Sequence, residues 1–153
     1  MVNSSSLKLE ILNVILAKLD ERILTLEQAV QSALESKSNE TKSSAGDKFE
    51  TGRAMIQKEQ EMRESILQQT KTLKAKALQV DLEKKHTQVE FGSLVFTTSG
   101  IYFISIGMGK LSIKDHVYFV VSVDAPVTKL LLGKKLGNSF KINNNSHEIL
   151  GIE

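Results

Sequence analysis

Residues 7–35, LKLEILNVILAKLDERILTLEQAVQSALE, carry an unbroken heptad pattern. Apolar residues recur along this stretch at alternating intervals of four and three: Leu12, Leu16, Leu19, Ile23, Leu26, Val30 and Ala33. The positions between them are mostly charged or polar, and neither Gly nor Pro interrupts the run. The spacing predicts one amphipathic helix of about 30 residues, roughly 45 Å long, with a narrow apolar stripe that packs against a partner helix.

The next helical pattern covers about residues 47–83 and supplies that partner. It is more polar than the first, and its expected apolar seam is Met55, Met62, Ile66, Gln69, Leu73 and Val80. The segment between the two patterns is rich in Ser, Asn and Gly, which favour turns over helix. We therefore predict an antiparallel coiled-coil hairpin over residues 1–85, with a polar tip at about residues 37–53.

From residue 86 onward the helical period is lost. Runs rich in β-branched and aromatic residues, which favour strands, occupy residues 89–98, 100–106 and 116–123. A short helix is expected over 126–133, because Pro suits the first turn of a helix and Gly its end. Two further short strands are expected at 141–142 and 147–152, around an Asn-rich turn. These elements predict a small antiparallel β-sheet domain with one helix over residues 86–153, and an α+β fold for the whole chain.

Composition excludes several classes of protein. The 153 residues contain no Cys, which rules out disulfides, thiolate zinc sites and Cys nucleophiles. The formal net charge of +2 gives no bulk electrostatic reason for nucleic-acid binding. No apolar run approaches the roughly 20 residues that a bilayer span needs, and no signal peptide is evident. We expect a cytoplasmic protein with no membrane partner.

Asp47 and Glu50 are the strongest candidate site residues in the polar tip. Two carboxylates three residues apart at a helix start could hold Mg²⁺, although such a site is incomplete and needs oxygens from a partner. On spacing alone, helix capping is the favoured role, and a capping side chain can still offer a free oxygen. Lys48 and Arg53 lie beside these acids and could contact phosphates, or could simply form a solvated helix surface.

Two other features have simpler interpretations. His86, His116 and His147 show no spacing typical of metal ligands, and we expect them at the surface or at strand edges. Residues 133–138, GKKLGN, lack the spacing of a phosphate-binding loop and are expected to form a basic turn after the short helix.

Four segments resemble the bacterial Gre transcript-cleavage factors (GreA and GreB). Residues 46–54, GDKFETGRA, resemble the family's tip, where Gly-Asp-x-x-Glu opens the second helix. Residues 121–127, VSVDAPV, resemble its Ser-x-Asp-Ser-Pro turn, and residues 131–137, LLGKKLG, its Leu-x-Gly-Lys-x-x-Gly ending. Residues 147–152 resemble its last strand. The C-terminal match is the more specific part of the resemblance.

The resemblance implies a coiled-coil hairpin joined to an FKBP-like domain that binds DNA-directed RNA polymerase at its secondary channel. It assigns Asp47 and Glu50 to the catalytic tip, where they help the polymerase hold a Mg²⁺ ion that promotes cleavage of backtracked RNA at the nascent 3′ end. It assigns Ser122, Asp124 and Pro126 to polymerase docking, and Lys48 and Arg53 lie where they could contact RNA. The protein would then be a monomeric regulatory factor with no active site and no cofactor of its own.

The tip departs from the family pattern, which leaves alternatives open. The family's Asn-Ala-Glu-Tyr is replaced by residues 51–54, TGRA, so that an acid and an aromatic are lost. One alternative is a secondary-channel regulator without cleavage activity. A second is an FKBP-like peptidyl-prolyl isomerase, which needs an aromatic-lined pocket from a chain with no Trp and two tyrosines, Tyr102 and Tyr118. The third is a coiled-coil interaction module with an inert tip.

Overall fold

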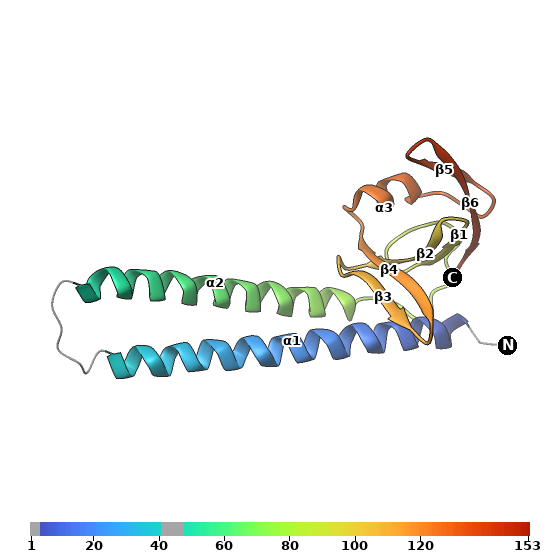
Figure 1. The fold of residues 1–153 in the computed structure, drawn as a ribbon. Coiled ribbons are helices and arrows are strands. Elements are labelled where there is room, and N and C mark those ends of the chain that lie inside the picture. Colours follow the sequence, from blue (N-terminus) through green and yellow to red (C-terminus); the bar gives the residue numbers. More distant parts are fainter. Residues whose placement is uncertain (1–3, 41–47) are drawn as a thin grey trace. The chain divides into compact units, whose positions relative to one another are not determined.

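The computed structural model describes the backbone of residues 4–40 and 48–153, and the side chains of residues 6–35 and 52–153 (Figure 1). The elements, in order, are α1 (Ser4–Glu40), α2 (Lys48–Ala77), β1 (Leu94–Thr97), β2 (Gly100–Ser105), β3 (Gly109–Ile113), β4 (His116–Ser122), α3 (Pro126–Leu131), β5 (Ser139–Ile142) and β6 (Asn145–Ile152). Two long helices followed by a β-sheet with one short helix confirm the predicted α+β class.

The chain divides into two compact units. Residues 16–75 form a helical unit, and residues 1–15 group with residues 76–153 in a β-sheet unit. The division into independent domains at 1–85 and 86–153 stays a prediction from the sequence. Among the described residues, no helix is long and apolar enough to cross a membrane.

In the helical unit, α1 and α2 run antiparallel (Figure 1). Lys74 Nζ lies 2.6 Å from Asp20 Oδ1, and Lys71 Nζ lies 3.4 Å from Glu27 Oε1. The paired residue on α2 therefore comes later in the sequence as the one on α1 comes earlier, as antiparallel helices require. Every seam residue predicted for α1 is buried or half-buried, and most positions between them are exposed. The heptad pattern therefore identified the contact face of α1 correctly.

The predicted seam of α2 is wrong at three of its six positions. Met55, Met62 and Gln69 are exposed, whereas Gln60 and Thr70 are 6% and 2% exposed. Thr70 can be buried because its Oγ1 donates a hydrogen bond to the Ile66 carbonyl oxygen at 2.7 Å. A search for apolar spacing selects the methionines and misses a contact face that contains polar residues.

Helix α2 also ends earlier than predicted, at Ala77 instead of about residue 83. The N–H groups of Gln79 and Val80 donate to the carbonyls of Lys76 and Ala77 at 3.0 and 3.2 Å. These bonds span three residues, so they tighten the chain into turns and do not continue the α-helix. Val80 is then buried in the β-sheet unit.

The described strands form one six-stranded sheet in the order β3-β4-β2-β1-β6-β5. The sheet is mixed and not purely antiparallel as predicted, because β2 and β4 pair in parallel, with Ile101 opposite Tyr118. The reason is β3, a strand that the sequence interpretation missed. It pairs antiparallel with β4 at the outer edge of the sheet, which turns β4 back parallel to β2.

The sheet has buried residues on both faces. One face carries the cluster Val89, Val95, Tyr102, Ile104, Leu131, Phe140 and Ile149. Phe103, next along β2, is also fully buried and faces the other side, since successive side chains alternate in a strand. Residues 1–15 belong to this unit: Ile11 and Ile15 are fully buried, and Glu10 pairs with Lys114 at 3.0 Å.

Candidate functional site

The predicted docking residues lie in one turn between β4 and α3. Ser122 ends β4 and Pro126 begins α3, where its missing N–H has no helical partner to lose. The Ser122 carbonyl accepts two hydrogen bonds, from the Thr128 hydroxyl at 2.6 Å and from the Ala125 N–H at 3.2 Å. Because Thr128 is completely buried, these bonds anchor the turn to the core of the unit.

The same turn leaves its side chains accessible. Ser122 is half-buried, and both Asp124 and Pro126 are exposed. The Asp124 carboxylate makes no ion pair with any residue that the structure describes. A carboxylate that is exposed on a hydrogen-bonded turn, without an ion pair in the described part of the chain, is suited to pair with a cation or N–H donor of another molecule.

The predicted tip lies mostly outside the described residues. Asp47 is outside them altogether, whereas Lys48 and Glu50 fall in the first turn of α2 and their side chains are not described. Arg53 is exposed on α2. The metal role of Asp47 and Glu50 and the RNA contacts of Lys48 and Arg53 therefore stay predictions. The described part of the chain contains no group of three or more His, Asp or Glu residues placed to hold a metal ion.

One histidine differs from the sequence expectation. The His86 side chain is 2% exposed, and its Nδ1 lies 2.7 Å from Glu90 Oε1, which Lys84 Nζ also approaches to 3.1 Å. The hydrogen bond from His86, followed by that from Lys84, lowers the pKa of the Glu90 carboxyl. This cluster fastens the segment between α2 and β1, so the buried position of His86 has a structural cause. His116 is exposed, and His147 is half-buried beside Thr98.

A groove between α3 and β5 was not anticipated. It has a volume of about 510 Å³ and is lined by Lys129, Leu130, Leu132, Gly133, Lys134, Asn138, Phe140 and Lys141. The sequence signal that could have found it is charge: residues 125–147 contain four lysines and no acidic residue. The sequence interpretation used only residues 133–138 of this stretch, as a basic turn.

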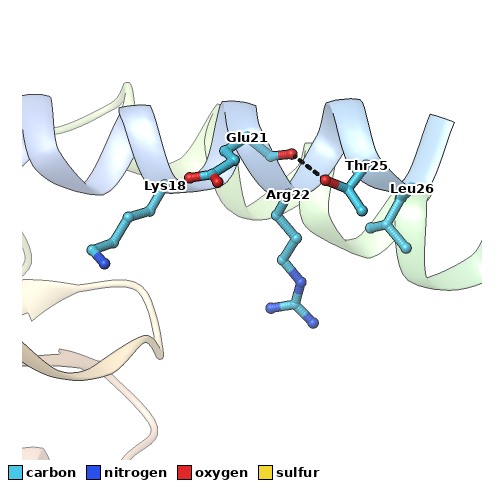
Figure 2. Close-up of a pocket in the computed structure, with 5 residues that line it drawn as sticks. All are labelled: Lys18, Glu21, Arg22, Thr25 and Leu26. Carbon is cyan, nitrogen blue, oxygen red and sulfur yellow. Dashed lines mark hydrogen bonds between the residues drawn. The ribbon is translucent and has the colours of Figure 1, made fainter. Parts of the chain in front are cut away.

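A second hollow lies on α1 and is lined by Lys18, Glu21, Arg22, Thr25 and Leu26 (Figure 2). Figure 2 shows these side chains along one side of a single helix, with the Thr25 hydroxyl donating to the Glu21 carbonyl at 3.0 Å. Its walls are side chains of one helix, so its shape changes with their rotamers. It does not have the convergent polar groups of a preformed binding site.

Comparison with solved structures finds distant similarity. The chain is similar to Gfh1 of Thermus aquaticus, whose crystal structure has 18% sequence identity to it. The match covers 94% of this chain and 92% of that chain, with a TM-score of 0.29. No protein-family model and no curated protein matches the chain. At this TM-score, the likeness does not bear on function.

Proposed function

We propose that this protein is a Gre-like transcription factor that binds RNA polymerase in its secondary channel and stimulates the polymerase's own cleavage of backtracked RNA. The supporting observation is the turn from Ser122 to Pro126. The residues that resemble the family's docking motif are fixed there by two hydrogen bonds to one carbonyl, and Asp124 stays exposed. The order of elements, two long helices and then a sheet with one short helix, agrees with this proposal.

In this proposal the chain contributes binding groups and no independent active site. Asp124 and its neighbours dock the factor on the polymerase, and the tip acids Asp47 and Glu50 add carboxylate oxygens to a Mg²⁺ that the polymerase also holds. Mg²⁺ prefers oxygen ligands and lowers the pKa of bound water, which provides the nucleophile for hydrolysis. Lys48 and Arg53 neutralise phosphates of the nascent RNA near its 3′ end. The factor acts in the cytoplasm as a monomer.

The test is a transcript-cleavage assay on backtracked elongation complexes with purified core polymerase. We expect the Asp47→Asn/Glu50→Gln double variant to bind polymerase as wild type does but to lose stimulated cleavage, because the amides keep the shape and remove the anionic oxygens. Glu59→Gln, which changes an exposed acid further along α2, is the matched control and should cleave normally. Undiminished cleavage by the double variant would show that Asp47 and Glu50 do not help to hold the Mg²⁺ ion.

The second candidate is a secondary-channel regulator that does not stimulate cleavage. It is favoured by residues 51–54, which lack the acid and the aromatic of the family's tip and present the exposed cation Arg53 instead. The same assay separates the two functions. Wild type that binds polymerase and alters initiation, yet never shortens the RNA of a stalled complex, would support the regulator.

An isomerase function has little structural support. Tyr102 and Tyr118 are buried in the β-sheet unit, and the Tyr102 ring stacks on Phe119 with centroids 5.4 Å apart. Both tyrosines therefore pack the core and are not placed to line an open proline pocket. A tetrapeptide isomerisation assay is expected to show no activity. An inert coiled-coil module is tested separately, by replacing residues 38–53 with a neutral turn.

A further inference from the structure

Lysines and exposed leucines gather at the groove between α3 and β5. Lys129 and Lys141 are exposed and Lys134 is half-buried, and none of the three forms an ion pair with a described residue. Leu130 and Leu132 are 41% and 49% exposed beside them, and no acidic residue lines the groove. Residues 125–147 contribute four positive charges and no negative one, whereas the net charge of the whole chain is only +2. The rest of the chain therefore has a net negative charge, and the excess of positive charge lies in this region.

Backbone hydrogen bonds fix the floor of the groove. The Gly133 N–H donates to the Val89 carbonyl at 2.8 Å, and the Val89 N–H donates to the Lys134 carbonyl at 2.8 Å. The Asn138 side chain accepts a further hydrogen bond from the Lys135 N–H at 2.8 Å. The segment that carries the lysines is thus tied to the sheet unit before any partner arrives, which lowers the entropy cost of binding.

One wall of the groove is an open strand edge. Strand β5 ends the sheet, and its hairpin to β6 turns through Asn143 and Asn144, both with positive φ, as a two-residue loop requires. Ile142 and Asn145 flank this loop and form a hydrogen-bonded pair, as in other two-residue hairpins. Hydrogen-bonded and non-hydrogen-bonded pairs alternate along antiparallel strands, so Lys141 and Ser146 are a non-hydrogen-bonded pair and the N–H and C=O groups of Lys141 point away from β6. Within the described residues, Lys141 makes no backbone hydrogen bond beyond the ladder. An extended chain can pair with this edge.

We infer that the groove between α3 and β5 binds an acidic segment of a partner protein in which large apolar side chains alternate with Asp or Glu. The acids pair with Lys129, Lys134 and Lys141, the apolar side chains cover Leu130 and Leu132, and the segment's backbone pairs with β5. A protein segment fits better than a nucleic acid. Single-stranded nucleic acids need accessible aromatic rings for stacking, and the one ring that lines this groove, Phe140, is buried. This inference assigns a second surface and does not require the partner to be polymerase.

The test is selection of binders from a phage-displayed library of random linear peptides, with the intact protein as bait. We expect the recovered peptides to be enriched in Asp and Glu next to Leu, Ile or Phe. Labelled copies should bind wild type and bind Lys129→Glu/Lys141→Glu roughly tenfold or more weakly, since reversed rim charges repel acidic ligands. Leu132→Ser should also weaken them. Lys85→Glu/Lys110→Glu reverses two exposed lysines elsewhere and is the matched control.

Circular dichroism and melting temperatures of every variant show whether the fold is retained, and Lys129→Arg/Lys141→Arg should restore binding because the charge is kept. Recovered peptides without acidic enrichment, or acidic peptides that bind the Lys129→Glu/Lys141→Glu variant as tightly as wild type, would overturn the inference. A labelled oligothymidylate is the nucleic-acid probe. Tight binding of this probe that is lost in the same variant would overturn it in favour of a nucleic-acid groove.

Discussion

Lys8 is a charged residue in the core of the β-sheet unit, with 2% of its surface exposed. Burial lowers the pKa of its ammonium group, and the negative charges of Glu153 and Asp81 offset part of this effect. A buried ammonium costs free energy that its attraction to nearby carboxylates recovers only in part. The aliphatic stem of Lys8, by contrast, gains from burial. The residue is therefore a net cost at the pH where it is charged.

The variant Lys8→Met keeps the stem and removes the charge. We expect it to raise the free energy of unfolding at pH 7 by about 1 kcal/mol, as replacement of buried ionic groups by apolar ones often does. In wild type, unfolding takes up protons in the window between the lowered pKa and 10.5, so stability rises with pH there; in the variant this rise should be absent.

Urea denaturation at a series of alkaline pH values measures both effects. Lys18→Met, at an exposed position on α1, is the control and should change little. A less stable Lys8→Met protein at pH 7 would show that the ammonium group contributes more through its carboxylate partners than burial costs.

Glu90 gives stability that also rises with pH, but in the acidic range, because its pKa too is lowered on folding. Its carboxylate accepts a hydrogen bond from His86 and pairs with Lys84, and these contacts lower its pKa from 4.5. The stability that they provide is fully present above the unfolded value and is lost as the pH falls through the lowered folded value. We expect Glu90→Gln to be less stable than wild type at pH 7 and to lose less stability on acidification below about pH 4.5.

Thermal unfolding of wild type and Glu90→Gln from neutral to acidic pH checks this expectation. The two melting temperatures should converge as the pH falls. A gap that is constant over the whole range would mean that the carboxylate charge is not what fastens His86. Glu83→Gln, an exposed acid in the same segment, serves as the control.

Helix α2 packs through a partly polar face. Gln60 is buried there. Among the described residues its Oε1 has no hydrogen-bond partner, and its Nε2 makes a long bond of 3.4 Å to Glu64. A buried polar atom without a partner destabilises the folded state. This observation places the weakness of the helical unit at a specific residue.

Two substitutions test the observed seam against the predicted one. Gln60→Leu should raise the free energy of unfolding by about 1–2 kcal/mol, because it removes an unsatisfied amide and adds apolar contact at similar volume. Met62→Ala should change it by less than about 0.5 kcal/mol, since Met62 is exposed. Denaturant unfolding gives both values. If Met62→Ala lowers the free energy of unfolding strongly and Gln60→Leu does not raise it, the seam predicted from the sequence would be supported instead.

The elements differ in how far the sequence could predict them. In residues 16–35 of α1 the contact face is purely apolar and mostly exposed, polar or charged positions surround it, so spacing alone identified the buried or half-buried positions there. In α2 hydrogen bonds within the helix let Thr70 be buried, and apolar spacing carries no information about such bonds. Strand β3 was missed because it is an edge strand with one buried residue, Leu111, among exposed neighbours.

The same reasoning applies to the candidate site. The turn from Ser122 to Pro126 was predicted from a local motif, and its bonds are local, so its position at the end of β4 followed directly. The groove between α3 and β5 joins residues of two consecutive elements, and the sequence pattern does not show how the chain between them folds back. His86 was expected at the surface or at a strand edge because it shows no metal-ligand spacing. Its partner Glu90 was expected in a strand over residues 89–98 but precedes β1 in the structure.

At the scale of the whole molecule, both long helices cross the boundary between the two units, α1 after residue 15 and α2 after residue 75. Residues up to 15 of α1 pack in the β-sheet unit, and the rest of the helix forms half of the helical unit. In the proposed function the two units have different tasks, since the turn at Ser122–Pro126 docks the factor and the tip acids contribute oxygens to the Mg²⁺ of the polymerase. Variants of the turn should therefore weaken polymerase binding, whereas variants of the tip should reduce cleavage and leave binding unchanged.

The most direct test of the polymerase proposal is the affinity of the purified protein for core RNA polymerase, measured with wild type and Asp124→Lys. Asp124 is exposed, so the substitution should leave the fold intact, which the melting temperature will show. We predict that wild type binds and that Asp124→Lys binds roughly tenfold more weakly, whereas the control Glu83→Lys binds normally. Failure of wild type to bind polymerase, or equal binding of the Asp124→Lys variant, would contradict the account.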